Sequence, residues 1–414
     1  METKRGLLCA LHPSIRVLRM ARELPYRTAQ SVEDMASFER ILSTCFAFAP
    51  EHSGPWIQRL GLAHVRLLGS ADQPAPAALA IFEMGQWFGG RRIACAGIAA
   101  VGVLPEHRGA GLAHRLMSEL VRELHGRKIA LSCLYPSTLA LYRGVGYEVA
   151  GARYEMRAVT ASLIDARDTL QVVPLASVND AALRACQAES AARGNGQLDR
   201  PEALWQRVES HRGEARDGYA VLDAAGLMRG YVWYARRAQA GSLWHELAAS
   251  DLVVLDLAAA RSLGTFLHRH RTTASDVVWY GGTDDPFFAA IPDVGAEQKL
   301  MSPWMIRIVD VVGALEARGY CTLLSGSVHL EISDPLIEAN RGRFTLTVEN
   351  GAARVTPGGL GSVQLDITDL AALYTAHASA EVRARFGRLR GSVPDLALLS
   401  SFFTGPAPSM PDMF

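Results

Sequence analysis

The residues best suited to chemistry lie in one stretch, Val101–Met117, where an apolar run leads through two glycines into a helical pattern. The run Ala96–Leu104 predicts a buried strand that stops at Pro105. The turn Arg108–Ala113 then opens the helix. The first N–H groups of a helix lack internal partners and its dipole is positive there, so this turn predicts an anion site. Glycine allows a phosphate to approach the backbone closely, and Arg108 adds a fixed positive charge.

A second segment of interest follows this helix. The apolar run Ile129–Leu134 predicts another buried strand, and a short helix is expected after it. Ser137 or Thr138 would cap the start of this helix, and a glycine, Gly144 or Gly146, would end it.

The two segments resemble the signature motifs of the GCN5-related N-acetyltransferases. The first has the form V-x-V-x-P followed by R-x-x-G-x-[GA], and the second, Tyr142–Tyr147, has the form Y-x-x-x-G-[FY]. The resemblance implies that acetyl-CoA is the co-substrate and that the glycine turn binds its pyrophosphate. The residues then expected along the cofactor are Val101, Gly102, Val103, Arg108, Gly109, Ala110, Gly111, Leu112, Ala113, His114, Ser137 and Thr138.

Acetyl transfer also needs an oxyanion donor and a proton for the leaving thiolate. The Val103 N–H is a candidate for the first task. Tyr142 is the candidate acid, because a phenol with a pKa of about 10 holds its proton at neutral pH. The alternative is that Tyr142 only packs under the Gly146 turn. His107 and His114 lie at the phosphate end, and we expect them on the surface rather than as bases.

The order of elements predicts an α/β (α+β) chain in three parts. Residues 25–159 are expected to form one domain, and residues 160–301 repeat its order of strands and helix. In the repeat, Asp256–Arg261 replaces the glycine turn, and its aspartate would repel a phosphate, so no second cofactor site is expected. Residues 302–414 predict a small α+β domain, and residues 1–24 a flexible extension.

This layout, with the motif W-M-I-R-I-V-D-V-x-x-A-L at Trp304–Leu315, resembles the enhanced-intracellular-survival (Eis) class of bacterial N-acetyltransferases. The resemblance implies tandem GCN5-related folds, the second degenerate, followed by a sterol-carrier-protein-like domain, in a homo-oligomer that is a hexamer. It also implies that the C-terminal tail enters the active site, where the α-carboxylate of Phe414 acts as the base. Glu51 and Trp56 are the candidates for the amine pocket. Phe48 stands where some relatives carry an acidic residue, which argues against polycationic aminoglycosides.

Composition excludes several classes of protein. The chain has 42 basic and 42 acidic residues among 414, and this balance argues against a nucleic-acid binder. Its six cysteines form no C-x-x-C pair, which predicts free thiols in a reducing compartment and no metal site. No apolar run reaches the length of a membrane span, so a cytoplasmic protein is expected.

Two functions remain at this point. The first is an acetyl-CoA-dependent N-acetyltransferase acting on a primary amine of a small molecule, an aminoglycoside among the candidates, or on a lysine side chain. The alternative is a lipid- or ligand-binding protein that uses the third domain and carries a relic acetyltransferase domain. The intact glycine turn and Tyr142 favour the enzyme, because a relic needs neither.

Overall fold

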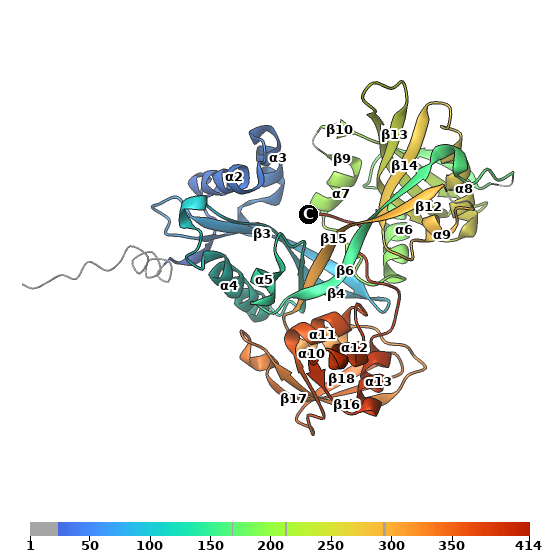
Figure 1. Ribbon diagram of the computed structural model, residues 1–414. Helices are drawn as coiled ribbons and strands as arrows, with labels where there is room; N and C mark the ends of the chain where they lie inside the picture. The colour runs from blue at the N-terminus through green and yellow to red at the C-terminus, as the bar shows by residue number, and fades with distance from the viewer. Residues whose placement is uncertain (1–23, 168, 212, 293–294) are drawn as a thin grey trace, which may run out of the picture. The chain divides into compact units, whose positions relative to one another are not determined.

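The computed structural model describes residues 24–167, 169–211, 213–292 and 295–414 (Figure 1). This part of the chain divides into two compact units, residues 24–81 with 99–120, and residues 82–98 with 121–414. Apart from Leu24, the expected N-terminal extension lies outside the described residues.

The first unit is built on a small antiparallel sheet. Its strands are β1 (Tyr26–Thr28), β2 (Val65–Leu68) and the first half of β3 (Ala77–Phe88), and it also holds α2 (Val32–Phe46), α3 (Pro50–Leu60), the end of β4 (Arg91–Val103) and the start of α4 (Leu112–Gly126). The segment Ser31–Ala36 predicts the start of a helix, and the Ser31 side chain caps α2 by accepting a hydrogen bond from the Asp34 N–H.

The apolar run Leu60–Leu68 predicts a strand, and this prediction is wrong over its first half. The strand is limited to Val65–Leu68, and Pro50–Leu60 forms helix α3. Pro50 is tolerated because it occupies the first helical turn, where a missing N–H costs nothing. Ser53, Ile57 and Leu60 are buried at helical spacing, so tertiary packing outweighs the low helix propensity of this segment.

The second unit contains a long sheet with the strand order β4-β5-β15-β6-β14-β13-β12-β11-β7. Its further strands are β5 (Leu131–Leu134), β6 (Glu148–Val159), β7 (Gln171–Leu175), β11 (Asp217–Leu222), β12 (Met228–Ala238), β13 (His245–Val254), β14 (Ala274–Gly281) and β15 (Ala296–Ile308). Shorter elements are α5 (Leu139–Arg143), α6 (Ala181–Ala192), α7 (Glu202–Glu209), α9 (Pro286–Ala289), β8 (Leu198–Asp199), β9 (Ser210–His211) and β10 (Glu214–Ala215).

The expected internal repeat is confirmed by the strand pairing. β4 and β5 are parallel, and so are β13 and β14, which are connected by α8 (Leu257–His268) as α4 connects β4 to β5. A parallel pair needs such a crossover. In the repeat, the Asp256 side chain accepts a hydrogen bond from the Ala259 N–H at 2.8 Å and binds Arg229 at 2.7 Å. The start of α8 is therefore capped by the side chain of Asp256.

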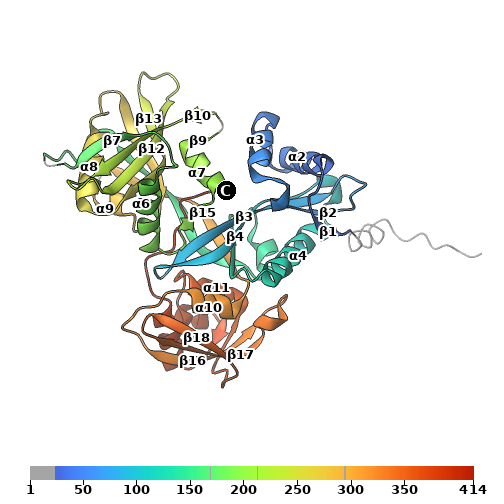
Figure 2. The same ribbon diagram turned by 180° about the vertical axis from the view of Figure 1, so that it is seen from behind.

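The last part of the chain forms a five-stranded sheet with the order β18-β17-β16-β19-β20. Helices α10 and α11 lie against one face of this sheet (Figures 1 and 2). The strands are β16 (Gly326–Ser333), β17 (Gly342–Glu349), β18 (Ala352–Pro357), β19 (Val363–Asp366) and β20 (Leu389–Arg390), and the helices are α10 (Val311–Ala317), α11 (Ile367–Tyr374), α12 (Ala380–Arg385) and α13 (Val393–Phe402). Alternating or apolar runs in the sequence predict β16, β17 and β18, and helical patterns at Asp369–Tyr374 and Val393–Phe403 predict α11 and α13.

Strand β15 crosses the expected domain boundary between residues 301 and 302, and it pairs with β5 and β6. At its end, Arg307 binds Asp334 at 2.6 Å, with both side chains fully buried. The segment Trp304–Ile308 thus belongs to the long sheet, and the exact division of the chain into domains stays a proposal.

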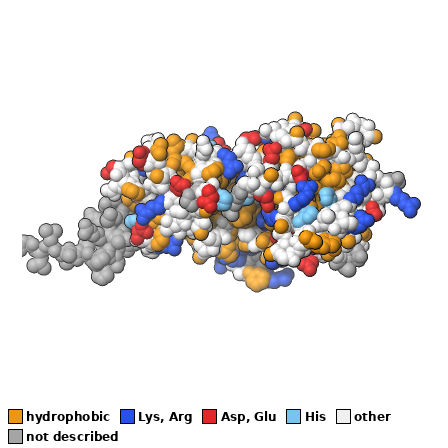
Figure 3. Space-filling model, turned by 90° about the horizontal axis from the view of Figure 1, so that it is seen from above, with side chains coloured by type: hydrophobic (Ala, Val, Ile, Leu, Met, Phe, Trp, Pro, Cys, Tyr) orange, Lys and Arg blue, Asp and Glu red, His pale blue; other side chains and the backbone are white. Residues whose placement is uncertain are grey.

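The surface is mixed in charge. On the face shown in Figure 3, Lys and Arg side chains are interspersed with Asp and Glu. In the described part of the chain, no helix is long and apolar enough to cross a membrane. The five described cysteines are free, and these same residue ranges contain no cluster of metal-ligating side chains.

Candidate active site

The glycine turn before α4 has the geometry of an anion cradle. Gly109 and Gly111 have φ values of 79° and 77°, a region that residues with a Cβ rarely adopt. A Cβ built at either glycine would meet no atom of the described residues within 4 Å, so this part of the chain leaves the space above the turn open. Helix α4 begins immediately afterwards, at Leu112. The N–H groups of its first turn are thus available to a pyrophosphate, and the residues present fit that group.

Arg108 joins the cradle to the end of β4. Its Nε donates a hydrogen bond to the Val103 carbonyl at 3.2 Å, and its Nη2 lies 3.9 Å from the Cys45 Sγ. The Cys45 thiol donates to the same carbonyl at 3.3 Å. These contacts hold the arginine beside the turn, while its side chain remains exposed.

The strand end Val101–Val103 is shaped by two local features. Ala100 has a φ of 53°, which interrupts the regular strand, and the ladder between β4 and β5 ends at Ile98. A Cβ at Gly102 would lie 2.3 Å from the Ile41 Cγ2. Gly102 is therefore required for packing against α2, a reason that the sequence did not reveal.

Tyr142 lies on α5 and is 4% exposed. Burial raises the pKa of its phenol, and a hydrogen bond with Ser137 opposes this rise. The group therefore keeps its proton at neutral pH, as an acid must. Its ring makes an edge contact with Tyr147 at 6.1 Å between centroids, so it is also a packing residue. Thr138 occupies the N-cap of α5, but its side chain makes no capping hydrogen bond.

The end of the chain is fixed along its backbone. The Tyr135 hydroxyl donates to the Met410 carbonyl at 2.5 Å, and the Arg153 Nε donates to the Pro411 carbonyl at 2.7 Å. One residue earlier, Ser409 forms a parallel bridge with Ala152. The sequence showed only a tail rich in proline and glycine, and these partners were missed because they lie more than 200 residues away.

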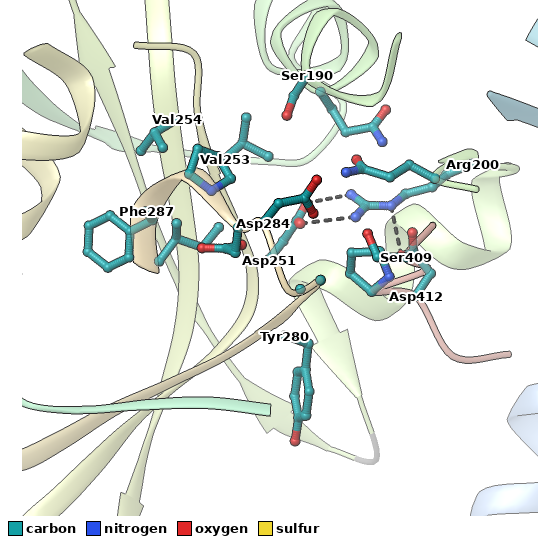
Figure 4. Close-up of a pocket in the computed structure, with 18 residues that line it drawn as sticks. Ser190, Arg200, Asp251, Val253, Val254, Tyr280, Asp284, Phe287, Ser409 and Asp412 are labelled. Carbon is teal, nitrogen blue, oxygen red and sulfur yellow. Dashed lines mark hydrogen bonds and ion pairs between the residues drawn. The ribbon is translucent and has the colours of Figure 1, made fainter. Parts of the chain in front are cut away.

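A buried ion network holds the same segment (Figure 4). The Arg200 Nε donates to the Asp412 Oδ1 at 2.8 Å, and its two terminal nitrogens bind Asp251. The Tyr231 hydroxyl donates to Asp251 at 2.6 Å. Burial alone would lower the pKa of Arg200, but the two carboxylates outweigh it and raise that pKa. Burial raises the pKa of Asp412, and Arg200 opposes this. A pocket of about 70 Å³ adjoins the network.

The ring of Phe414 packs among aromatic side chains. Its centroid lies 5.8 Å from that of Phe82 and 6.1 Å from that of Tyr135. A Cβ at Gly97 would come within 2.9 Å of this ring and 2.3 Å of Met84. In the sequence, a glycine within an apolar strand was the feature that could have predicted this close approach.

The other candidates belong to the first unit. Trp56 packs against Phe38 at 5.8 Å and Phe48 at 6.2 Å, so it forms part of an apolar cluster. Glu51 is exposed in the first turn of α3. His107 and His114 are exposed, as expected. The candidate site residues divide between the two units. The first unit contains Glu51, Trp56, Val101, Gly102, Val103, Arg108, Gly109, Ala110, Gly111, Leu112, Ala113 and His114, and the second contains Ser137, Thr138, Tyr142 and Phe414.

Comparison with known proteins identifies the family. Models of acetyltransferase (GNAT) domains match residues 25–150 and 196–308, and a sterol carrier protein domain matches residues 311–411. A solved structure of a GCN5-related N-acetyltransferase from Anabaena variabilis is 34% identical, with a TM-score of 0.90, over 95% of this chain and 100% of that one. The chain belongs to the GCN5-related N-acetyltransferases.

Two curated relatives refine this assignment. An uncharacterized N-acetyltransferase of Streptomyces griseus is 29% identical over 79% of this chain and 83% of its own length. N-acetyltransferase Eis of Mycobacterium tuberculosis is 26% identical over 71% and 74%. With two GNAT domains and a sterol carrier domain, the protein is an Eis-like acetyltransferase. GNAT enzymes use acetyl-CoA, and the glycine turn is the segment that fits its pyrophosphate.

The open cradle predicts the effect of a charge at Gly111. Gly111→Asp should abolish coenzyme A binding, because a carboxylate would repel the pyrophosphate within its own site. Gly111→Ala is the matched control, since it carries the same backbone strain without the charge and should lose far less affinity. Calorimetric titration with coenzyme A measures both variants, and unchanged affinity in a folded Gly111→Asp protein would refute the cradle.

Proposed function

We propose that this enzyme transfers the acetyl group of acetyl-CoA to a primary amine of a small molecule or to a lysine side chain. The observation that carries the proposal is the turn at Gly109 and Gly111, with its open space at the start of α4. Arg108 and the N–H groups from Gly109 to His114 would hold the pyrophosphate. Val101–Val103 would hold the pantetheine arm, with Ser137 and Thr138 along the cofactor.

The chemical step needs two groups from this chain. As the amine nitrogen bonds to the thioester carbon, the Val103 N–H would donate to the oxygen that gains charge. When the carbon–sulfur bond breaks, Tyr142 would give its proton to the leaving thiolate. Its buried, protonated phenol supports this role.

The base is the second part of the proposal. By family resemblance it is the α-carboxylate of Phe414, and the fixed backbone of Met410 and Pro411 supports an ordered tail. Glu51 and Trp56 are proposed for the amine pocket. The same resemblance supports a cytoplasmic homo-hexamer and the division into domains at residues 25–159, 160–301 and 302–414.

The function is tested by incubating the protein with acetyl-CoA and each of a panel of amines and measuring the release of free thiol. Thermal unfolding separates it from the ligand-binding alternative. Coenzyme A at about 100 times its dissociation constant should stabilise the protein by about 2.7 kcal/mol. Stabilisation by fatty acids with no response to coenzyme A would favour the alternative.

Tyr142→Phe should keep the fold and coenzyme A affinity but lose turnover by about 10²–10⁴-fold, the usual contribution of a general acid. Tyr147→Phe is the matched control, because this buried phenol hydrogen-bonds Ser132 at 2.7 Å and is given no chemical role. Steady-state rates at saturating acetyl-CoA measure the effect. A near-normal rate in Tyr142→Phe would show that Tyr142 has a packing role only.

An amide at the C-terminus tests whether the charge of the Phe414 α-carboxylate, rather than the packing of its ring, is needed for turnover. A protein made by ligation with an amide in place of the α-carboxylate keeps every side chain, so its ring should still pack on Phe82 and Tyr135. If the charge is the base, turnover should fall by about 10²-fold or more. Equal rates for the acid and the amide would assign the base to a side chain or a water molecule.

A further inference from the structure

A second pocket, of about 270 Å³, adjoins the tail on the side of α7 and strands β12–β14. In Figures 1 and 2 the end of the chain lies beside α7. Four arginines line this pocket, Arg153, Arg207, Arg216 and Arg237, and among the described residues that line it Asp412 is the one acid. A concave site with such a lining concentrates anions.

Two of these arginines share one carboxylate. Glu214 accepts hydrogen bonds from the Arg237 Nε at 2.8 Å and from the Arg216 Nη2 at 3.1 Å. The hydrogen bond from Arg237 is the largest cause of the lowered pKa of Glu214, so this acid is charged. A single negative charge cannot neutralise both guanidinium groups, and Glu246, whose charge also raises the pKa of Arg237, is itself paired with Arg157.

Arg216 is buried at the wall of the pocket, with 6% of its side chain exposed. Its Nη1 donates to the carbonyls of Arg207 and Val208, which fixes its position. Its Nε has no hydrogen-bond partner among the described residues. Such a buried, incompletely paired donor is costly unless something at the site compensates it.

The guanidinium group of Arg153 is held in a fixed orientation. Its guanidinium lies 3.4 Å from the centroid of the Tyr280 ring, and its Nε donates to the Pro411 carbonyl. In the described ranges Arg153 forms no ion pair; its charge helps to lower the pKa of Asp412, which is itself paired with Arg200. Stacking and the Nε hydrogen bond fix the plane of the group, so its two terminal nitrogens are preorganised for a pair of oxygens.

We propose that this pocket binds the oxyanion of a small acceptor molecule, a carboxylate or a phosphate, with Arg153 as the main ligand and Arg237 beside it. The identification of the molecule as the acceptor rests on the proposed function. Pro411 and Met413 line the pocket, so a bound molecule lies against the tail that ends at Phe414. The volume suits a small molecule, and the arginines disfavour a polycation.

Binding is tested first without acetyl-CoA, by calorimetry on the full chain. The probes are 4-aminobutanoate, phosphoethanolamine and 1,4-diaminobutane. At least one anionic probe should bind at least tenfold more tightly than the diamine, and the comparison of the two anions identifies carboxylate or phosphate as the preferred group. Equal or tighter binding of the diamine would overturn the proposal.

Variants then locate the site. Arg153→Gln and Arg237→Gln should each weaken binding of the preferred anion at least tenfold and leave coenzyme A affinity unchanged. Arg236→Gln is the matched control, because this neighbour on β12 pairs with Asp217 at the surface and does not line the pocket. Unchanged anion affinity in Arg237→Gln and Arg153→Gln, or loss of coenzyme A affinity instead, would overturn the pocket assignment.

The two proposals can fail separately. If the anion binds and the variants lose it, but no probe is acetylated, the pocket stands and the proposed function fails. If amines are acetylated with no preference for an anionic group in KM, the function stands and the anion site is overturned.

Discussion

Arg200 carries one positive charge and lies buried between two carboxylates, Asp251 of β13 and Asp412 of the tail. Each acid remains in the protein interior only while this guanidinium is beside it, because removing one partner of a buried ion pair costs about 3–5 kcal/mol. The last residues of the chain therefore cannot leave without exposing an uncompensated network. The Ser409 N–H donates to the Asn195 carbonyl at 2.9 Å, and the Asn195 Nδ2 donates to the Pro406 carbonyl at 3.2 Å.

The second acetyltransferase domain contributes to this arrangement. Its helix α8 begins at Leu257 and is capped by Asp256. Arg200 and Asn195 come from this part of the chain and contact the tail, and Asp251 binds Arg200. This part of the chain thus supplies residues that position the end of the chain, together with most of the arginines of the pocket beside it.

Local signals in the sequence predicted the elements that depend on local physics. Ser31 caps α2, and Gly109 and Gly111 adopt a left-handed conformation because glycine alone does so readily. Helix α3 was missed because Pro50 and Pro55 reduce its propensity, while burial of Ile57 stabilises it.

The contacts of the tail and the pocket could not be predicted, because their residues are far apart in the sequence. Asp412 and Arg200 are separated by 212 positions, and nothing local marks them as partners. Each arginine of the pocket, taken alone, looks like an ordinary surface residue. Only the fold places Arg153 on the ring of Tyr280 and lets Arg216 and Arg237 share Glu214.

The central claim is that the buried ion network positions the tail for catalysis. Asp412→Asn tests it most directly, because it removes the charge of this one side chain and leaves the α-carboxylate of Phe414 and the pair of Arg200 with Asp251 intact. Hydrogen–deuterium exchange of residues 405–414 and turnover are measured on the same protein. The account predicts faster exchange in the tail and a fall in kcat of about tenfold or more, with unchanged coenzyme A affinity, since small displacements of reacting groups cost up to about 10²-fold. Faster exchange with an unchanged kcat would contradict it.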